Sequence, residues 1–166
     1  YEGSIHSRAR TSQTAQIFRL ADIEDTTFGS EGVTPVIGHR QKSLKVSVVI
    51  PTFKREQVLL DTIRSLLSLE EPADEIIIVD QTQDHRKATI EQLESWQDNE
   101  SIIWIKRDKP STTAAMNQGL IVANNRLVLF VDDDISAKAG LVSNHAKVHE
   151  ADNDCWVTAG QGIQPW

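Results

Sequence analysis

Short apolar runs alternate with longer amphipathic stretches from Lys45 onward, and this alternation is the strongest structural signal in the sequence. Runs rich in Val, Ile and Leu, with the length of buried strands, occupy residues 46–50, 76–79, 102–105 and 127–131. Stretches with apolar side chains at helical spacing occupy residues 57–69, 85–97 and 112–124. Strands that are apolar throughout need cover on both faces, and crossover helices give a parallel sheet that cover. The pattern therefore predicts an α/β fold with a mostly parallel, Rossmann-like sheet and flanking helices.

The two ends of the chain show a weaker pattern. Residues 1–44 are rich in Ser, Thr, Gln and Gly, and among them only residues 17–20 look able to dock on a folded core. We interpret residues 1–44 as a partly ordered N-terminal extension that adds little to the central sheet. Residues 45–166 form the folded domain in this interpretation, with a further helix at 138–150 and a short strand at 156–159.

Composition and charge exclude several classes of protein. Lys and Arg together number 17 and Asp and Glu number 24, which gives a formal net charge of -7. A nucleic-acid-binding domain usually carries a basic face, so no nucleic-acid partner is expected. Cys155 is the single cysteine, which rules out an internal disulfide and favours a reducing compartment. No apolar run reaches the roughly 18 residues of a membrane span, so we expect a cytoplasmic protein whose full-length form could still associate with a membrane.

Polar residues follow the apolar runs at the positions where a parallel sheet collects its ligands. Pro51, Thr52 and Phe53 come after the first run, Asp80 after the second, and Asp132–Asp134 after the fourth. In an open parallel sheet the carboxyl ends of the strands border the binding crevice. Three adjacent carboxylates repel one another unless a cation lies among them, and Mg²⁺ and Mn²⁺ prefer such oxygen ligands. The pattern predicts a metal-dependent site there, with a solvated acidic turn as the simpler alternative.

The geometry of an extended strand would separate the three aspartates. Successive side chains alternate sides, so Asp132 and Asp134 are expected on one side and Asp133 on the other. The outer position of Asp134 favours it as a direct metal ligand. A turn at this point of the chain would break the alternation.

Four segments of the chain carry a recognisable set of motifs in a fixed order. They are Val48–Arg55, Ile76–Asp80 followed by Asp84, Lys109–Leu120 with its Asn-x-Gly signature, and Phe130–Asp134 with its Asp-x-Asp motif. Together these segments resemble the first half of the inverting glycosyltransferases of family two, which have the GT-A fold. The sequence departs from the family pattern at three positions. Lys54 stands in place of a frequent Asn, Gln81 in place of a second Asp, and Met116 in place of an Arg.

This resemblance implies a nucleotide-sugar site and a role for several of the matched residues. Thr52 and Asp80 would bind the nucleoside, usually uridine or its deoxythymidine equivalent. Asp132 would meet the ribose or a metal-bound water, and Asp134 would coordinate the Mn²⁺ or Mg²⁺ that bridges the diphosphate, with Asp132 belonging to the same metal site. The nucleotide-binding positions that the resemblance implies are Pro51, Thr52, Phe53, Arg55, Asp80, Lys109, Asn117, Asp132 and Asp133.

The implied reaction transfers a sugar from a nucleoside diphosphate sugar to an acceptor hydroxyl with inversion. The departing diphosphate develops charge that a Lewis acid neutralises, and the anomeric carbon passes through an oxocarbenium-like state. A carboxylate base must deprotonate the acceptor, which can be a saccharide, a lipid or another hydroxyl compound. In the family that base lies beyond the position of Trp166, so we interpret the chain as a piece that holds the donor site. The sheet edge left open by such a truncation could pair with a second copy to give a homo-oligomer.

The sequence also leaves open two other enzyme classes and one non-enzymatic alternative to a glycosyltransferase. Phe130–Ser136 resembles the strand motif of haloacid-dehalogenase-type phosphatases, in which the first Asp is a nucleophile, although that motif would normally open the domain. A nucleotidyltransferase of similar fold would need a Gly-rich, basic loop where Pro51–Glu56 stands. The chain could also be a fragment that binds nucleotide without activity.

Two histidines and two tryptophans could belong to a metal site or a sugar platform, but structural roles are expected for all four. His145 and His149 are four residues apart, as metal ligands on a helix can be, yet no third ligand is evident and an exposed helix face is expected. Trp96 and Trp104 are expected to pack in the core rather than to form a sugar platform.

Overall fold

The structure is a computed structural model that describes residues 16–19 and 44–160. Its strands are β1 (Gln16–Arg19), β2 (Val46–Thr52), β3 (Glu75–Asp80), β4 (Ile103–Lys106), β5 (Leu127–Phe130) and β6 (Val157–Ala159). Its helices are α1 (Gln57–Leu67), α2 (Lys87–Asp98), α3 (Thr112–Val122) and α4 (Leu141–Ala151). The predicted helices and strands after residue 45 are all present, with ends within a few residues of those expected.

The described strands form a six-stranded sheet in the order β4-β3-β2-β5-β1-β6. β2 is parallel to both β3 and β5, and β3 is parallel to β4. The mostly parallel α/β sheet predicted from the sequence is therefore confirmed. The chain passes from β2 outward to β3 and β4 and then returns to the other side of β2 with β5. A reversal of strand order of this kind opens a crevice at the carboxyl ends of the strands.

β1 departs from the expectation that residues 1–44 add little to the sheet. This strand lies between β5 and β6 and is antiparallel to both, with Gln16 opposite Phe130 and Arg19 opposite Leu127. The free edge of β5 carries backbone N–H and C=O groups that need partners, and a short segment from far away in the sequence supplies them. The expectation is thus wrong for Gln16–Arg19, whereas the division of the chain at residue 45 stays a prediction.

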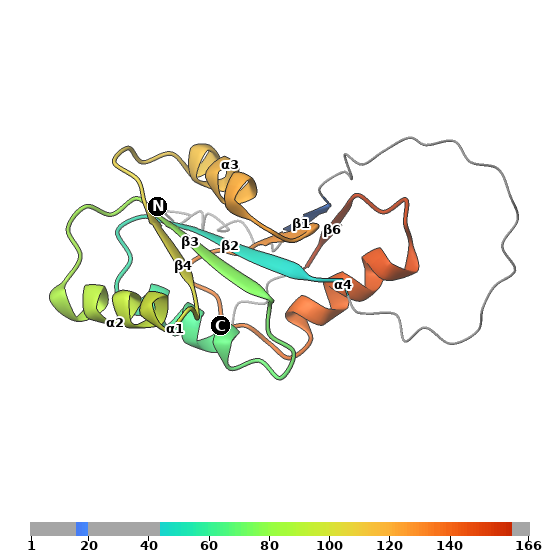
Figure 1. The fold of residues 1–166 in the computed structure, drawn as a ribbon, viewed down its shortest axis with the longest axis horizontal. Coiled ribbons are helices and arrows are strands. Elements are labelled where there is room, and N and C mark those ends of the chain that lie inside the picture. Colours follow the sequence, from blue (N-terminus) through green and yellow to red (C-terminus); the bar gives the residue numbers. More distant parts are fainter. Residues whose placement is uncertain (1–15, 20–43, 161–166) are drawn as a thin grey trace, which may run out of the picture.

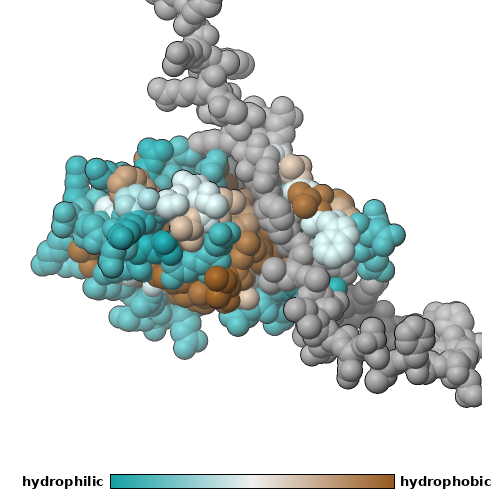
Figure 2. Space-filling view, turned by 90° about the horizontal axis from the view of Figure 1, so that it is seen from above, coloured by the Kyte–Doolittle hydropathy of each residue, from teal (hydrophilic) through white to brown (hydrophobic). Residues whose placement is uncertain are grey.

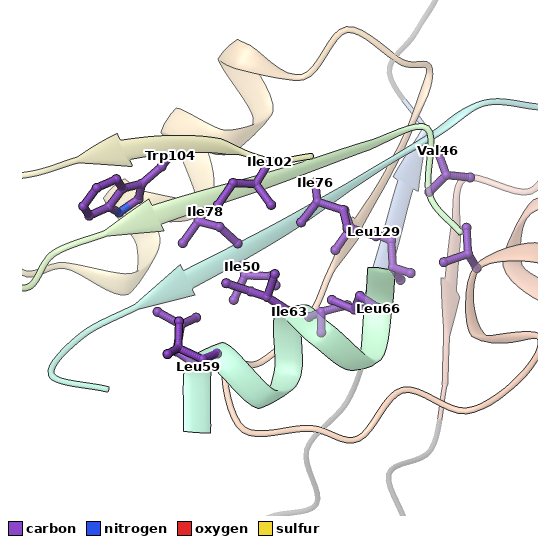
Figure 3. Packing of buried hydrophobic residues seen from close by; sticks show 14 of the residues in the cluster. Val46, Ile50, Leu59, Ile63, Leu66, Ile76, Ile78, Ile102, Trp104 and Leu129 are labelled. Carbon is purple, nitrogen blue, oxygen red and sulfur yellow. The ribbon is translucent and has the colours of Figure 1, made fainter. Parts of the chain in front are cut away.

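Hydrophobic side chains cover both faces of the sheet. Figure 1 shows α1 and α2 on one side and α3 on the other. Ile50 of β2 points to the first side, where it meets Leu59 and Ile63 of α1 (Figure 3). Val49, its neighbour in sequence, belongs to the second layer together with Ala115 of α3, because successive side chains of a strand alternate faces. The two layers hold β2 rigidly at the centre of the sheet.

Close packing of α3 on β2 depends on a glycine. A Cβ atom placed on Gly119 would lie 2.3 Å from Cγ1 and 3.1 Å from Cγ2 of Val49. Carbon atoms in contact are normally about 3.5–4.0 Å apart, so the helix reaches its observed position because residue 119 has no side chain. This gives a packing reason for the glycine of the Asn-x-Gly signature.

Trp96 and Trp104 pack in the core as predicted. Trp104 is 9% exposed and belongs to the layer under α1 and α2, and Trp96 packs against the same layer. The guanidinium of Arg64 lies 5.6 Å from the Trp96 ring centre, and the ammonium of Lys106 lies 4.1 Å from the Trp104 ring centre.

His145 and His149 are buried, so the prediction of an exposed helix face is wrong for them. Their exposed fractions are 8% and 0%. Nδ1 of His145 lies 2.7 Å from the Thr158 hydroxyl, and Nδ1 of His149 lies 3.0 Å from the carbonyl oxygen of Cys155. Burial lowers the pKa of His145, and the neighbouring His149 lowers it further. The two imidazoles tie α4 to β6 and the turn before it.

Figure 2 shows the side of the molecule that carries α3, where most of the described surface is hydrophilic and hydrophobic side chains gather in patches. None of the helices in the described residues is long and apolar enough to cross a membrane. A shallow depression of about 430 Å³ runs along α2, but a single helix lines it and no strand end reaches it.

Candidate functional site

A hollow of about 330 Å³ lies where the carboxyl ends of β2, β3 and β5 meet. Segments from five parts of the chain converge on it: the end of β2, the loop that follows, the residue after β3, the first turn of α3, and the aspartate triplet after β5. Its lining residues are Pro51, Thr52, Phe53, Arg55, Gln81, Thr112, Asp132, Asp133 and Asp134. This is the edge of the sheet at which the sequence predicted a site, and it includes the point where the strand order reverses.

Asp133 is the best-anchored aspartate of the triplet. Its Oδ2 accepts a hydrogen bond of 2.7 Å from the Thr52 hydroxyl, which joins the ends of β2 and β5. Arg55 lies against two of the aspartates, with Nε 3.3 Å from Oδ1 of Asp133 and Nη2 3.3 Å from Oδ2 of Asp134. The expected alternation, with Asp133 pointing away from the other two, is wrong because β5 ends at Phe130 and the triplet curls into a turn.

Asp132 carries the least compensated charge of the triplet. Although Asp132 as a whole is exposed, partial burial of its carboxyl raises the pKa above the usual value, and the charges of Asp134 and Asp133 raise it further. Within the part of the chain that the structure describes, no hydrogen bond or ion pair reaches the Asp132 carboxylate, whereas Arg55 serves its two neighbours. A cation that entered the hollow would find its strongest unbalanced charge at this residue.

A hydroxyl on α1 shapes the turn that holds the triplet. The Thr62 hydroxyl is 1% exposed and lies 3.0 Å from the carbonyl oxygens of both Asp133 and Ile135. One turn further along the helix, the Ser65 hydroxyl accepts a 3.0 Å hydrogen bond from the backbone N–H of Ala137. The helix that packs under β2 therefore also holds the backbone after β5, and the turn that the sequence left open at the triplet is the one observed.

Gln81 and Thr112 line the hollow although they were not among the predicted site residues. Gln81 stands where the family often has a second Asp, and its amide joins two other segments. Its Nε2 lies 3.2 Å from the carbonyl oxygen of Thr52, and its Oε1 accepts a hydrogen bond from the backbone N–H of Ser111. Ser111 in turn caps α3, because its hydroxyl accepts from the N–H of Ala114 at 3.3 Å. The N-terminus of α3 is thereby held at the rim of the hollow, with Thr112 in the lining.

Three predicted binding residues lie outside this lining. Asp80 is fully buried beneath the hollow, where its two carboxylate oxygens accept hydrogen bonds from the Thr82 N–H, an imidazole and an indole. Lys109 and Asn117 are exposed on the loop before α3 and on α3 itself. The geometry thus brings together most of the predicted residues but does not offer Asp80 as a direct ligand.

The loop after β2 has a strained backbone. Lys54 has a φ of 54°, a left-handed conformation that Asn tolerates better than Lys. Its N–H donates to the Thr82 hydroxyl at 2.7 Å, and its ammonium lies 5.1 Å from the ring centre of Phe53. The turn leaves the Phe53 ring 40% exposed at the rim of the hollow. The frequent Asn of the family at position 54 therefore has a conformational explanation.

A comparison with known protein families decides the assignment of this chain. The profile described as Glycosyl transferase family 2 matches residues 47–164. The chain belongs to glycosyl transferase family 2. This assignment agrees with the fold and with the placement of the hollow, and it argues against the phosphatase and nucleotidyltransferase alternatives.

Two curated relatives of this family 2 chain are bacterial. The chain is 29% identical over 109 residues to "Uncharacterized glycosyltransferase YfnE" of Bacillus subtilis, which covers 64% of the chain and 27% of that protein. It is 30% identical over 100 residues to "GalNAc(5)-diNAcBac-PP-undecaprenol beta-1,3-glucosyltransferase" of Campylobacter jejuni, which covers 60% of the chain and 32% of that protein. The chain thus matches about a third or less of the length of these relatives.

Solved structures of glycosyltransferases share the fold. The S. aureus TarS 1-349 structure in complex with UDP superposes with a TM-score of 0.56 at 21% identity, over 66% of this chain and 33% of that one. A mannosyltransferase from Pyrobaculum calidifontis, in complex with GDP-Man and Mn2+, gives a TM-score of 0.57 at 19% identity, over 68% of this chain and 34% of that one. At these identities the likeness supports the GT-A fold, which agrees with the prediction from sequence.

Proposed function

We propose that this chain carries the donor half of an inverting, metal-dependent glycosyltransferase and binds a nucleoside diphosphate sugar in the hollow at the sheet edge. The observation that carries the proposal is the hydrogen bond from Thr52 to Asp133 within a family 2 chain. It joins the loop that would hold the nucleoside to the carboxylates that would face the diphosphate. Both halves of the proposed nucleotide-sugar site would thus lie at the same reversal of strand order.

The nucleoside would lie against the loop after β2. The exposed Phe53 ring offers a flat surface for a base. The Gln81 amide is already engaged, with Nε2 on the carbonyl oxygen of Thr52 and Oε1 on the N–H of Ser111, so it would shape this surface rather than bind the base. We propose uridine or deoxythymidine as the nucleoside; a UDP complex is known for the structural neighbour TarS, and a GDP-mannose complex for the neighbour from Pyrobaculum.

The carboxylates fit a hard divalent cation such as Mn²⁺ or Mg²⁺. Asp132 and Asp134 would hold it, because Asp132 lacks a compensating partner among the described side chains and hard cations take oxygen ligands. No group of three or more His, Cys, Asp or Glu side chains in the described residues forms a ready-made metal cage. Such a cation is usually completed by substrate phosphates and water, so a partial protein site suits a metal that arrives with the diphosphate. When bound, the cation supplies Lewis-acid stabilisation of the leaving diphosphate.

The residues of this chain would bind and orient the donor. In the transfer, the bond between the anomeric carbon and the diphosphate oxygen breaks, and a new bond forms to the acceptor oxygen, whose proton passes to a carboxylate base. Thr112 and the N-terminus of α3 offer a positive helix end near the diphosphate. Arg55 adds a permanent positive charge on the other side of the hollow. The acceptor would be a saccharide, lipid or other hydroxyl compound.

Isothermal titration of UDP, dTDP and GDP, each with and without Mn²⁺, tests this proposal. We expect Asp132→Asn and Asp134→Asn to remove most of the gain in affinity that Mn²⁺ gives. Asp133→Asn should instead weaken binding with or without the metal, because its partner Thr52 shapes the nucleoside loop. Asp98→Asn, exposed at the end of α2, is the matched control and should change nothing.

Two outcomes would decide against the proposal. If the chain binds none of the nucleoside diphosphates, or binds them with no dependence on Mn²⁺, the metal-dependent donor site is refuted. If it binds them but no variant of the triplet differs from the Asp98→Asn control, the site lies elsewhere. Binding without transfer in a longer chain that contains the base would favour the alternative of a nucleotide-binding fragment without activity.

A further inference from the structure

A largely buried chain of hydrogen-bonded side chains, Asp80, His85 and Glu56, runs beneath the hollow and takes no direct part in the proposed binding site. Nε2 of His85 lies 2.7 Å from Oδ2 of Asp80, and Nδ1 of His85 lies 3.2 Å from Oε1 of Glu56. The exposed fractions of the three side chains are 2% for His85, 0% for Asp80 and 27% for Glu56. The imidazole therefore stands between two carboxylates, almost out of contact with solvent.

The contacts place His85 against both carboxyl groups at once. Each of its two ring nitrogens lies within hydrogen-bonding distance of one of them. A polar group as deeply buried as the Asp80 carboxyl is tolerated only when it is hydrogen-bonded. The indole N–H of Trp104 at 3.0 Å and the backbone N–H of Thr82 at 2.9 Å complete the shell of Asp80. Removal of His85 would therefore take one of three hydrogen-bond partners from a fully buried carboxyl group.

The two ends of this buried chain hold the loop after β2. Glu56 precedes α1 and also accepts hydrogen bonds from the Thr89 hydroxyl and the Arg86 N–H at the start of α2. At the other end, Thr82 is fixed by Asp80 and accepts the hydrogen bond of the strained Lys54 N–H at 2.7 Å. The loop 53–56 is thus fastened at two points to the loop that follows β3.

We propose that His85 is a positioning residue which, through Asp80 and Glu56, holds the loop 53–56 in the shape that presents Phe53 and Arg55 to the hollow. The part of this inference that concerns nucleotide affinity rests on the proposed function. Asp80 then acts from beneath the site through Thr82 and His85, and not as a ligand of the nucleoside. This accounts for a fully buried carboxylate at the end of β3 in a position where the sequence suggested a base contact.

Amide hydrogen exchange on the 166-residue chain tests the positioning role without any ligand. The readout is the protection of the Lys54 amide divided by that of Ile77, a core amide of β3, so that a change in global stability cancels. We expect His85→Gln to lower this ratio at least about tenfold, because the two hydrogen bonds that join the imidazole to Asp80 and Glu56 are lost. Glu56→Gln keeps an acceptor in place and should lower the ratio less, which keeps the test usable if His85→Gln folds poorly.

The matched control is Ile90→Ala, which trims a half-buried side chain on α2, the helix that follows His85, and lies outside the buried chain. It should lower overall stability and leave the Lys54 to Ile77 ratio unchanged. If His85→Gln leaves the ratio unchanged as well, or if Ile90→Ala lowers it equally, His85 is merely structural and the inference is overturned.

Titration with UDP and Mn²⁺ provides the functional arm of the same experiment. His85→Gln should weaken binding about tenfold or more, whereas Ile90→Ala should bind as the wild type does. Wild-type affinity in His85→Gln despite a lost exchange ratio would overturn the link to the site. Failure of the wild-type chain to bind would refute the proposed function, while the exchange ratio would still decide whether His85 holds the loop.

Discussion

Substitution of Gly119 by Ala probes how tightly α3 is packed on β2. The added Cβ would lie 2.3 Å from Cγ1 of Val49, which is more than 1 Å closer than an ordinary carbon contact of about 3.5–4.0 Å. Val49 is fully buried in a central strand and cannot swing away. Overpacking of this kind costs about 1–3 kcal/mol, and the better helix propensity of Ala returns roughly 1 kcal/mol. We expect Gly119→Ala to lower the free energy of unfolding by up to about 2 kcal/mol.

A double-mutant cycle in urea, followed by circular dichroism, measures this effect. Val49→Ala alone should cost roughly 2 kcal/mol, because it removes two buried methyl groups. In the double variant the methyl group added at residue 119 fills the space of the two methyl groups removed from residue 49. The double variant should therefore lose about 1 kcal/mol or more less stability than the sum of the two single losses. Thr113→Ala, exposed on the same helix, is the control and should stay within about 0.5 kcal/mol of wild type. Strictly additive losses, or a more stable Gly119→Ala protein, would refute the packing argument.

Three other substitutions test the site and the α4 segment. Lys54→Asn should stabilise the metal-free chain by up to about 1 kcal/mol in urea, because Asn accepts the left-handed φ of 54° more readily; a loss of stability would contradict this. Asp132→Asn should raise metal-free stability by less than about 1 kcal/mol at pH 7. Folding raises the pKa of Asp132 above its ordinary value of 3.8, so the ionised carboxylate costs stability only at a pH above that value. The gain from Asp132→Asn should therefore vanish near pH 3, and an equal gain at pH 3 and pH 7 would exclude the charge explanation. Folding lowers the pKa of His145, so at a pH below its ordinary value of 6.5 the unfolded chain binds more protons and stability decreases as the pH is lowered. His145→Gln should lose less stability than wild type between pH 7.5 and pH 5.5, and the same pH dependence of the urea midpoint in both proteins would contradict this.

The site region could be predicted from sequence because its position follows from local pattern. Aliphatic runs of strand length mark β2 and β5, and polar residues directly after them must lie at the carboxyl edge of a parallel sheet. Thr52, Phe53, Arg55 and the three aspartates all line the hollow for this reason. The family resemblance added the chemistry, since a row of carboxylates alone does not name a ligand.

The features that escaped prediction depend on contacts between distant segments. The sequence indicates that residues 17–20 can dock, but it does not name β5, more than a hundred positions away, as the partner of Gln16–Arg19. It allows a turn at the aspartate triplet, but it does not show that the Thr62 hydroxyl on α1 bonds the backbone of that turn. The absence of a third ligand favours an exposed His145, yet the Thr158 hydroxyl satisfies its imidazole in a buried position. Local periodicity carries no information about any of these partners.

The charges around the hollow bear on the order in which its ligands can enter. Among the described residues Arg55 pairs with Asp133 and Asp134, whereas no cation pairs with Asp132. A bare diphosphate would bring further negative charge to three carboxylates, and the pKa of Asp132 is already raised by burial and then by the charges of Asp134 and Asp133. A divalent cation would weaken both repulsions at once, so we expect metal and diphosphate to favour each other's binding. A nucleoside contact with Phe53 would carry no such charge, which is why affinity for the base and dependence on the metal should separate in the triplet variants.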